Sequence, residues 1–548
     1  MHRASVKIKF MNLGPVGDLS PRTDPEAYSA IVNMSYFMLR HYYHLHGLGQ
    51  DRVIWQKAEL FQLDSFETIC QNLQADSPDI LGLSVFLWNE TLQNRIADWC
   101  KINLPNTIIV MGGPQLVAHK DPTWLADHPS VDYVVYGDGE KAFQQIIDWH
   151  LGLLPDRSTW VNIVAQENQQ QKTHPFEQLT DAEYFSSSPF LWQRDFVLEH
   201  IDDLIARGVS RDHISVGLEF SRGCMYACSF CDWSQNLTKK VKRRRYDWRQ
   251  EIDFWKSQDI CIRETDANFG QWDEDKEIYD YALTLYEPGG NFKFMVYNTS
   301  KLKKNVEHFV INNARYYGGR VRLALQDIDT DVLRKMDRPS LTWEEHKAMI
   351  RRIQSQPDID PKMISVSLML GAAGQTFDGL CNTLCELWAN GVYNYQLNWW
   401  MLLPNSPAAD SFYQRLHGLE WMRVFYIYRH PAVVGYELND LYQAMKQDWP
   451  IKKHFIESTH AMYRTKTMSF QDLMAMHILY EDLKAFKITN PDYYKIQDLQ
   501  PLMQQWKQIA QAEAQHQWQL NQLLIQEHKF AVLGRYIPHT KTLTKWFT

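Results

Sequence analysis

Three closely spaced cysteines constrain this chain more than any other feature of its sequence. Cys224, Cys228 and Cys231 form a Cys-x3-Cys-x2-Cys pattern directly after an apolar stretch that predicts a strand. With 8 cysteines in 548 residues, this spacing arises by chance in roughly 0.002 chains of the same composition. No fourth Cys or His follows soon after, as a structural zinc site would require. Three thiolates on a cube of four irons leave one iron open, so the motif predicts a [4Fe–4S] cluster that can bind a further ligand.

The composition is that of an ordinary globular protein of two to four domains. Lys and Arg number 57 against 65 Asp and Glu, a net charge of −8, which argues against nucleic-acid binding because that needs a basic face. The N-terminus lacks the apolar core of a signal peptide. The longest apolar run, 364–371, is far shorter than the roughly 20 residues that span a membrane. We therefore expect a cytoplasmic protein with no membrane contact.

The hydrophobic pattern divides the chain into an α/β first domain (1–165), a linker (166–212), a second α/β domain (213–410) and a C-terminal part (411–548). In the first domain, apolar runs alternate with helical patterns and predict a Rossmann-like, doubly wound parallel sheet. These runs are 6–13, 52–60, 79–88, 107–113 and 132–139. The polar segment 166–172 interrupts the pattern and predicts the start of the linker.

Six further strand–helix units fill the second domain. They predict a complete or partial TIM-type βα barrel with its chemistry at the carboxyl ends of the strands. The expected strands are 214–220, 260–267, 292–298, 321–327, 364–371 and 393–404. Beyond residue 411 the strands are expected to stop, which leaves a mostly helical part that closes the barrel mouth.

The cysteine motif, with the aromatic Phe230 just before its last cysteine, resembles the radical S-adenosylmethionine superfamily. The resemblance implies that S-adenosylmethionine chelates the open iron near Phe230. It also implies that an electron, delivered by a donor such as flavodoxin or ferredoxin, cleaves the cofactor to a 5′-deoxyadenosyl radical. In this chemistry the cofactor does the difficult step, and the protein supplies position and excludes water.

Other strand ends of the second domain fit the same resemblance. Segment 264–270 is similar to the site that binds the cofactor's amino group, so Glu264 or Asp266 is expected to accept hydrogen bonds from it. An acidic loop that only caps a helix is the alternative. Gln326, in a segment similar to the family's fourth-strand signature, is a further candidate for cofactor binding. Segments 371–376 and 402–407 resemble the family's fifth and sixth strand ends.

Three strand ends of the first domain carry glycines and polar residues where open α/β sheets bind ligands. Position 142 is Ala, so a dinucleotide-binding Gly-x-Gly-x-x-Gly is absent. Placed before a cluster domain, the three segments resemble the cobalamin-binding domain of cobalamin-dependent radical S-adenosylmethionine enzymes. The resemblance gives as cofactor-binding candidates Ser84, Trp88, Asn89, Gly112, Gly113, Pro114, Gln115, Gly137, Gly139 and Glu140.

The same resemblance bears on the axial ligand of the corrin and on the direction in which the three loops face. Segment 12–18 has no histidine, so a bound corrin is expected to lack a protein imidazole; a domain that has lost its corrin is the alternative. The loops with Trp88, Gly113 and Gly139 should face Cys224, because methyl transfer requires both cofactors in one pocket.

Two weaker signals have plain alternatives. The basic run 239–245 is either a solvated loop or a set of cations that neutralise the carboxylate of the cofactor or of an acidic substrate. Cys381 and Cys385 are too few for an auxiliary cluster and are expected to be small buried residues. Histidines such as His454, His460 and His477 form no metal motif.

The resemblance implies a methyltransferase that acts on an unactivated carbon of a small-molecule or peptide substrate. The radical would remove hydrogen from that carbon, which would then take a methyl group from the corrin. A cyclisation, rearrangement or oxidation, with or without corrin, is one alternative. A non-enzymatic iron–sulfur sensor is another, although a sensor needs none of the further cofactor signatures.

Overall fold

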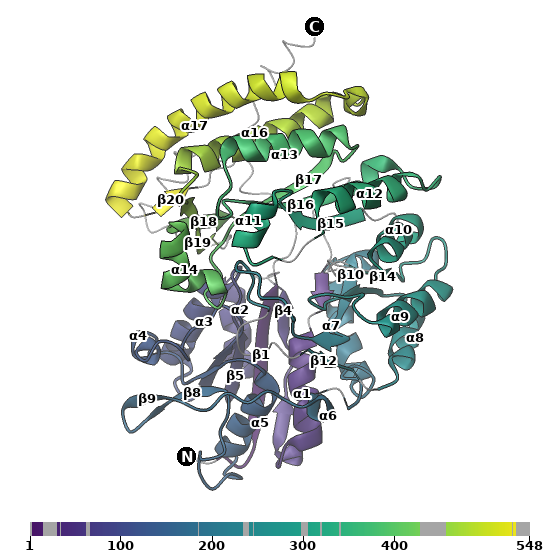
Figure 1. Ribbon diagram of the computed structural model, residues 1–548. Helices are drawn as coiled ribbons and strands as arrows, with labels where there is room; N and C mark the ends of the chain where they lie inside the picture. The colour runs from purple at the N-terminus through teal and green to yellow at the C-terminus, as the bar shows by residue number, and fades with distance from the viewer. Residues whose placement is uncertain are drawn as a thin grey trace.

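The computed structural model describes residues 3–14, 30–32, 34–61, 66–184, 186–233, 241–244, 246–296, 305–317, 321–338, 341–427, 456–528 and 530–532. In Figure 1 the first domain (purple and blue) lies at the bottom, the second (teal and green) lies at the right and centre, and the C-terminal helices cross the top. None of the helices in the described ranges is long and apolar enough to span a membrane.

A largely parallel sheet forms the first domain, as predicted. Its strands run in the order β3-β1-β5-β6-β7 and continue into an antiparallel edge, β8-β9, while β4 pairs with β1. Their bounds are β1 (Val6–Gly14), β3 (Val53–Trp55), β4 (Glu59–Phe61), β5 (Ile80–Ser84), β6 (Ile108–Gly112), β7 (Tyr133–Val135), β8 (Ile163–Glu167) and β9 (Gln170–Thr173).

Helices cover both faces of this sheet because alternate strand residues point to opposite sides. On β5, Leu81 and Leu83 pack in one core with α2 (Phe66–Asp76), α3 (Glu90–Asn103) and α4 (Trp124–Asp127), whereas Ile80 packs in the opposite core. That second core includes α1 (Met34–His46) and α5 (Gly139–His150). Because both faces of the sheet are covered, residues on both sides of each strand are buried, and the strand segments are almost wholly apolar.

The predicted linker is structured at its start, so the prediction is wrong there. Gln166 pairs with Gln171 in the β8–β9 hairpin. The amide of Gln171 donates to the carbonyl of Ala118 and accepts from the backbone of Leu125. Polar side chains at a sheet edge therefore support neighbouring loops rather than marking a linker. Two helices follow, α6 (Asp181–Tyr184) and α7 (Arg194–Ala206).

All six expected strands of the second domain are present. They are β10 (Ile214–Leu218), β13 (Cys261–Glu264), β14 (Phe294–Met295), β15 (Val321–Gln326), β16 (Ile364–Leu370) and β17 (Asn394–Trp399). They form two parallel sheets, β14-β13-β10-β2 and β15-β16-β17, with no pairing between the two in the described ranges. One strand of the first 165 residues, β2 (Ala30–Val32), joins the first of these sheets. A barrel that unites both sheets remains a prediction.

Helices follow these strands as the βα pattern predicts. They are α8 (Trp248–Ser257), α9 (Asp273–Thr284), α10 (Val306–Tyr317), α11 (Thr330–Lys335), α12 (Trp343–Gln354) and α13 (Phe377–Ala389). A short antiparallel pair, β11 (Ser221–Arg222) and β12 (Lys242–Arg243), precedes α8. This pair flanks the cysteine motif in the sequence.

The C-terminal part is not purely helical. Helices α14 (Ser411–His417), α16 (Phe470–Thr489) and α17 (Gln500–His528) match the prediction, and α16 and α17 lie over α13 at the top of Figure 1. However, β18 (Glu420–Ile427), β19 (Ile456–Arg464) and β20 (Phe530–Val532) form a three-stranded sheet. The prediction that strands stop at residue 411 is therefore wrong, because β18 pairs with strands distant in sequence that no local pattern reveals.

Candidate active site

The three cysteines lie in a loop, here called the cluster loop (residues 223–233), between β11 and β12. Cys224 and Cys228 are buried and Cys231 is half-buried. A backbone hydrogen bond anchors the loop, in which Ser229 N donates to the carbonyl of Met336 over 2.9 Å. In the described ranges no three His, Cys, Asp or Glu side chains are grouped as a single metal ion requires. A four-iron cluster places different demands, since each thiolate binds a different iron.

A buried arginine supplies positive charge to all three thiols. Arg338 is 5% exposed, and its guanidinium lies over the ring of Phe230, 5.7 Å from the centroid. Burial lowers the pKa of Arg338, whereas Cys228, Cys231 and Cys224 oppose that shift. A buried cation beside three sulfurs fits an anionic cluster better than it fits neutral buried thiols. The residues present therefore suit the predicted cluster.

The segment at the end of β13 carries the predicted Glu264 and brings one unpredicted residue into contact with the cluster loop. Glu264 is 2% exposed at the carboxyl end of the strand. Beyond it, Asn268 donates from Nδ2 to Cys224 Sγ over 2.8 Å. Sequence reasoning singled out segment 264–270 but not Asn268. The signal available was an amide within a loop that already carried two candidate carboxylates.

Asp266 has a different place from the one predicted. Its Oδ1 accepts from the backbone N of Phe220 over 2.7 Å, and its Oδ2 accepts from Ser221 Oγ over 2.6 Å. Burial, together with the charge of Glu219, raises the pKa of Asp266 to about 7. Both oxygens are thus used to hold the turn that leads into the cluster loop, which leaves Glu264 as the better candidate for the cofactor's amine.

Gln326 ends β15 in a conformation that costs energy. Its φ of 70° is in the left-handed region, which costs about 1–3 kcal/mol for such a residue. Its side-chain Oε1 is buried with no hydrogen-bond partner in the described part of the chain. Strain and an orphaned acceptor at a strand's carboxyl end together favour a ligand-binding role.

A neighbouring buried glutamine, missed by sequence reasoning, joins this strand end to the next. Gln375 Nε2 donates to Asp327 Oδ2 over 2.6 Å, and Gln375 Oε1 accepts from the backbone N atoms of Gly371 and Ala372. The predicted fifth-strand turn is thus fixed beside Gln326.

In the first domain, the loop after β5 divides into structural and available residues. Asn89 is fully buried and donates to the carbonyls of Leu13 and Ser84, so it fastens the loop rather than facing a ligand. Trp88 is half-buried and stacks on Phe86 with centroids 4.6 Å apart. Of Trp88 and Asn89, only Trp88 can therefore offer a flat surface to a ligand.

The glycines after β6 allow two loops to touch. Gly113 has a φ of 125°, and a Cβ there would lie 2.3 Å from the carbonyl oxygen of Val85. Gly112 has room for a Cβ. Pro114 and Gln115 are half-buried and Gly113 is exposed, so this loop presents an open edge. The predicted first-strand loop, 12–18, is described only as far as Gly14.

The third loop is bound by ion pairs to the cluster domain. Arg222, two residues before Cys224, has its Nη1 3.0 Å from Glu140 Oε1 and 3.3 Å from Asp138 Oδ1. Asn405, after β17, donates to the carbonyls of Pro114 and Leu116. The loops of Gly113 and Gly139 both contact the second domain, which supports the predicted orientation; that they face the cluster remains a prediction. Glu140, expected to bind cofactor, contacts Arg222 through Oε1.

Comparisons with known proteins place this arrangement. No family model matches the chain. The methyltransferase TokK of Streptomyces tokunonensis, described as a cobalamin-dependent radical SAM methyltransferase, is 27% identical over 339 residues, 60% of this chain and 48% of that protein. A 2-(S-pantetheinyl)-carbapenam-3-carboxylate methyltransferase of Streptantibioticus cattleyicolor matches with the same identity and coverage. The chain is a relative of the cobalamin-dependent radical S-adenosylmethionine enzymes. It spans about half the length of these curated relatives.

Two solved structures have a fold similar to that of this chain. TsrM from Kitasatospora setae, solved with cobalamin and a [4Fe-4S] cluster bound, has a TM-score of 0.51 at 16% identity over 74% of each chain. The cobalamin-dependent radical enzyme OxsB has a TM-score of 0.57 at 14% identity over 99% of this chain and 75% of its own. The second likeness extends over the C-terminal part.

The basic run 239–245 has partners within the protein, so neither predicted role fits its described residues. Arg243 Nη2 lies 2.8 Å from Glu274 Oε2, Lys242 pairs with Asp138, and Arg244 pairs with Glu251. Residues 239, 240 and 245 lie outside the described ranges. These cations act within the protein rather than on a cofactor carboxylate.

Cys381 and Cys385 are buried in α13, as expected. Burial raises the pKa of Cys381 to about 12 and that of Cys385 to about 11. Both therefore lie in an apolar core as protonated thiols. Of the three histidines noted, His454 lies outside the described ranges, and His460 and His477 belong to no metal-binding group among the described residues.

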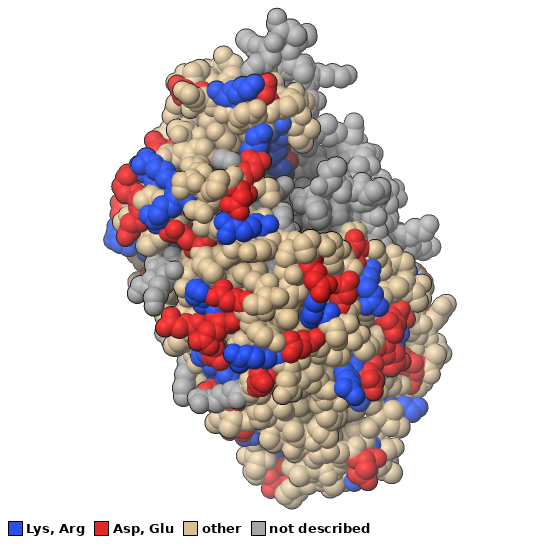
Figure 2. Space-filling view, turned by 90° about the vertical axis from the view of Figure 1, so that its right-hand side faces the viewer, with Lys and Arg blue, Asp and Glu red and all other residues tan. Residues whose placement is uncertain are grey.

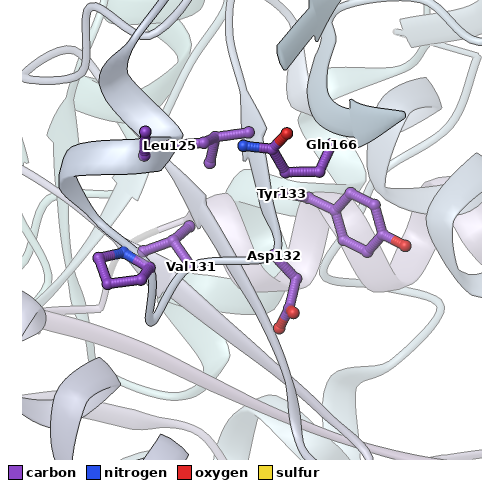
Figure 3. A pocket seen from close by; sticks show the side chains of 7 residues that line it. Leu125, Val131, Asp132, Tyr133 and Gln166 are labelled. Atoms are coloured by element: carbon purple, nitrogen blue, oxygen red, sulfur yellow. The ribbon is translucent and has the colours of Figure 1, made fainter. Parts of the chain in front are cut away.

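A separate cavity of about 440 Å³ lies away from the site. It is lined by Leu125, Ala126, Pro129, Val131, Asp132, Tyr133 and Gln166 (Figure 3). Tyr133 begins β7, so the cavity is at the opposite end of that strand from Gly137 and Gly139. Ligands of such sheets bind at the carboxyl end, and we assign this cavity no part in the chemistry.

Proposed function

We propose that this chain is a cobalamin-dependent radical S-adenosylmethionine methyltransferase that acts on an unactivated carbon of a small-molecule or peptide substrate. The observation that carries the proposal is the contact of two carboxyl-edge loops of the first sheet with the segments that flank Cys224 and follow β17. Two curated relatives that are methyltransferases support it. On the face in Figure 2, acidic and basic side chains are interspersed, which suits a small substrate better than a nucleic acid.

The second domain would hold the cluster and S-adenosylmethionine. When bound, these groups supply a carbon radical, and a corrin supplies a methyl group. Cys224, Cys228 and Cys231 would bind three irons as thiolates, with Arg338 balancing their charge. Glu264 would accept hydrogen bonds from the cofactor's amine. Gln326 Oε1 is a further buried acceptor suited to the cofactor.

The first domain would hold the corrin against its carboxyl edge. Trp88 offers a flat apolar surface, and the exposed Gly113 with Pro114 and Gln115 lets a bulky ligand approach the backbone. Gly112, Gly137, Gly139 and Ser84 lie at the same edge. A bound corrin should lack a protein imidazole, because segment 12–18, after the first strand, contains no histidine.

One reconstitution separates this function from its alternatives. Protein loaded anaerobically with iron, sulfide and hydroxocobalamin should hold about four irons. It should retain corrin after desalting and form 5′-deoxyadenosine with a reduced flavodoxin or a chemical reductant. Cleavage without retained corrin would indicate a corrin-free radical enzyme, and a bound cluster without cleavage would indicate a sensor. Given a substrate, transfer of an isotopically labelled methyl would distinguish methylation from rearrangement or oxidation.

A further inference from the structure

A buried ionic network connects the third loop of the first domain to the strand pair that flanks the cluster loop. Arg222 on β11 contacts Glu140 and Asp138 of the first domain and Glu219 of its own domain. Lys242, opposite Arg222 on β12, pairs with Asp138. Lys242, Asp138 and Glu140 are each less than 5% exposed, whereas the side chain of Arg222 is 26% exposed. The two carboxylates are thus largely shielded from solvent and salt.

The charges in this network depend on one another. Burial works to raise the pKa of Asp138, but Arg222 and Lys242 hold that pKa below its ordinary value. Burial and the charge of Asp138 raise the pKa of Glu140, against the effect of Arg222. Removing one partner of a buried pair leaves an uncompensated charge, which is costly. Arg222 has the most ionic partners in the network and lies two residues before Cys224 in the chain.

A second set of contacts joins the same two parts on the other side of the cluster loop. Asn405 Nδ2 donates to Pro114 O over 2.8 Å and to Leu116 O over 2.9 Å. Three residues on, Ala408 N donates to the carbonyl of Ser229, which lies between Cys228 and Phe230, over 2.9 Å. The segment 405–408 thus contacts both the second loop of the first domain and the cluster loop.

We propose that Arg222 is a positioning residue that sets the placement of the first domain's carboxyl edge relative to the cluster loop, with Lys242 and Asn405 in support. This role rests on the proposed function, since the edge and the loop would carry the corrin and the cluster. Arg222 touches neither cofactor in this role; it acts through Asp138 and Glu140 on one side and through the chain leading to Cys224 on the other. A misplacement of about 1 Å between reacting groups costs about 10²-fold in rate.

The test compares two reactions of one cofactor in loaded, full-length protein without substrate. Reductive cleavage to 5′-deoxyadenosine needs only the cluster and S-adenosylmethionine. Transfer of the methyl cation from the sulfonium to a reduced corrin, which leaves S-adenosylhomocysteine, also needs the two domains in register. In Arg222→Met the ratio of S-adenosylhomocysteine to 5′-deoxyadenosine should fall about 10²-fold. Arg222→Lys, which keeps the charge but not the two-pronged geometry, should restore part of it.

Arg243→Met is the matched control. Arg243 lies on the same strand pair, but its guanidinium contacts Glu274, Asp275 and Trp272 of its own domain, so its loss should leave the ratio unchanged. A wild-type ratio in Arg222→Met, or an equal fall in both variants, would overturn the positioning role.

Hydrogen exchange tests the same role without a corrin. Peptides that span 113–118 and 137–144 should exchange faster in Arg222→Met than in the wild type, and at the wild-type rate in Arg243→Met. Unchanged exchange in Arg222→Met would overturn the role of Arg222 whatever the cofactor content. Wild-type protein that cleaves S-adenosylmethionine but holds no corrin would overturn the proposed function instead, while faster exchange in Arg222→Met would still support the interdomain contact.

Discussion

The amide of Asn268 donates a hydrogen bond to the sulfur of Cys224, with Nδ2 and Sγ 2.8 Å apart. Asn268 is 4% exposed, so the contact is made in a place from which water is largely excluded. Hydrogen bonds to cluster sulfurs help to set reduction potentials. Since such a bond stabilises the more negative, reduced cluster, Asn268 should make the cluster easier to reduce.

Replacing Asn268 should therefore lower the reduction potential of the cluster. Asn268→Leu removes the donor at similar volume, and Asn268→Asp also places a negative charge beside the sulfur. The reduction potential should therefore be highest in the wild type, lower in Asn268→Leu and lowest in Asn268→Asp. Redox titration followed by electron paramagnetic resonance measures this order. An unchanged potential in both variants would show that Asn268 has no electronic influence on the cluster.

The parts of this site that could be predicted are those that local sequence expresses. The spacing of Cys224, Cys228 and Cys231 is local because one loop must supply all three ligands, and apolar runs mark strands because each strand is buried on both faces. Contacts between distant segments have no such signature. Arg222 and Asp138 are 84 positions apart, and Asn405 and Pro114 are 291 apart.

Asp266 and β18 illustrate the same rule. Asp266 was expected to meet a cofactor because it is an acid at a strand end, but its oxygens hold Phe220 and Ser221. The residue type indicates a polar contact at this strand end, but the sequence does not indicate which residues make that contact. Likewise, the segment that forms β18 carries no sign of β19, which begins at Ile456.

Changing Cys224, Cys228 and Cys231 together to Ala should abolish cluster binding. The variant should hold no cluster iron and form no 5′-deoxyadenosine, because its three ligands are gone. The double variant of Cys381 and Cys385, also to Ala, is the control and should keep about four irons. Iron analysis and chromatography of the products measure both quantities. Cleavage by the triple variant would contradict the assignment of the cluster.

Gly113→Ala should weaken corrin binding while leaving the iron content intact. Its Cβ would meet backbone atoms of Val85 at 2.3 and 2.9 Å, and the left-handed conformation adds strain of about 1–3 kcal/mol. Both loops at the corrin edge must then shift. Gly208→Ala, after α7, is the control, since Gly208 is also in a left-handed conformation (φ 90°) but a Cβ there would meet nothing within 4 Å. Cobalamin absorbance after desalting, against iron content, measures the result; equal retention in both variants would count against this edge as the corrin site.

Asp266 should give the folded protein a pH dependence of opposite sign to that of an ordinary ion-paired carboxylate. Burial raises its pKa from 3.8 to about 7, so between these values the folded chain holds a proton that the unfolded chain releases. The contribution of the protonated side chain to the free energy of unfolding is therefore full below about pH 4 and is lost as the pH rises to about 7.

Asp266→Asn does not titrate and can still accept from Ser221. The Tm of Asp266→Asn relative to the wild type should thus rise from pH 5 to pH 7 and then level off. Asp195→Asn, at a side chain that is 97% exposed, should show no such trend. Thermal unfolding followed by circular dichroism across this range measures the difference, and a flat difference for Asp266→Asn would show that this carboxyl is ionised in the folded protein throughout.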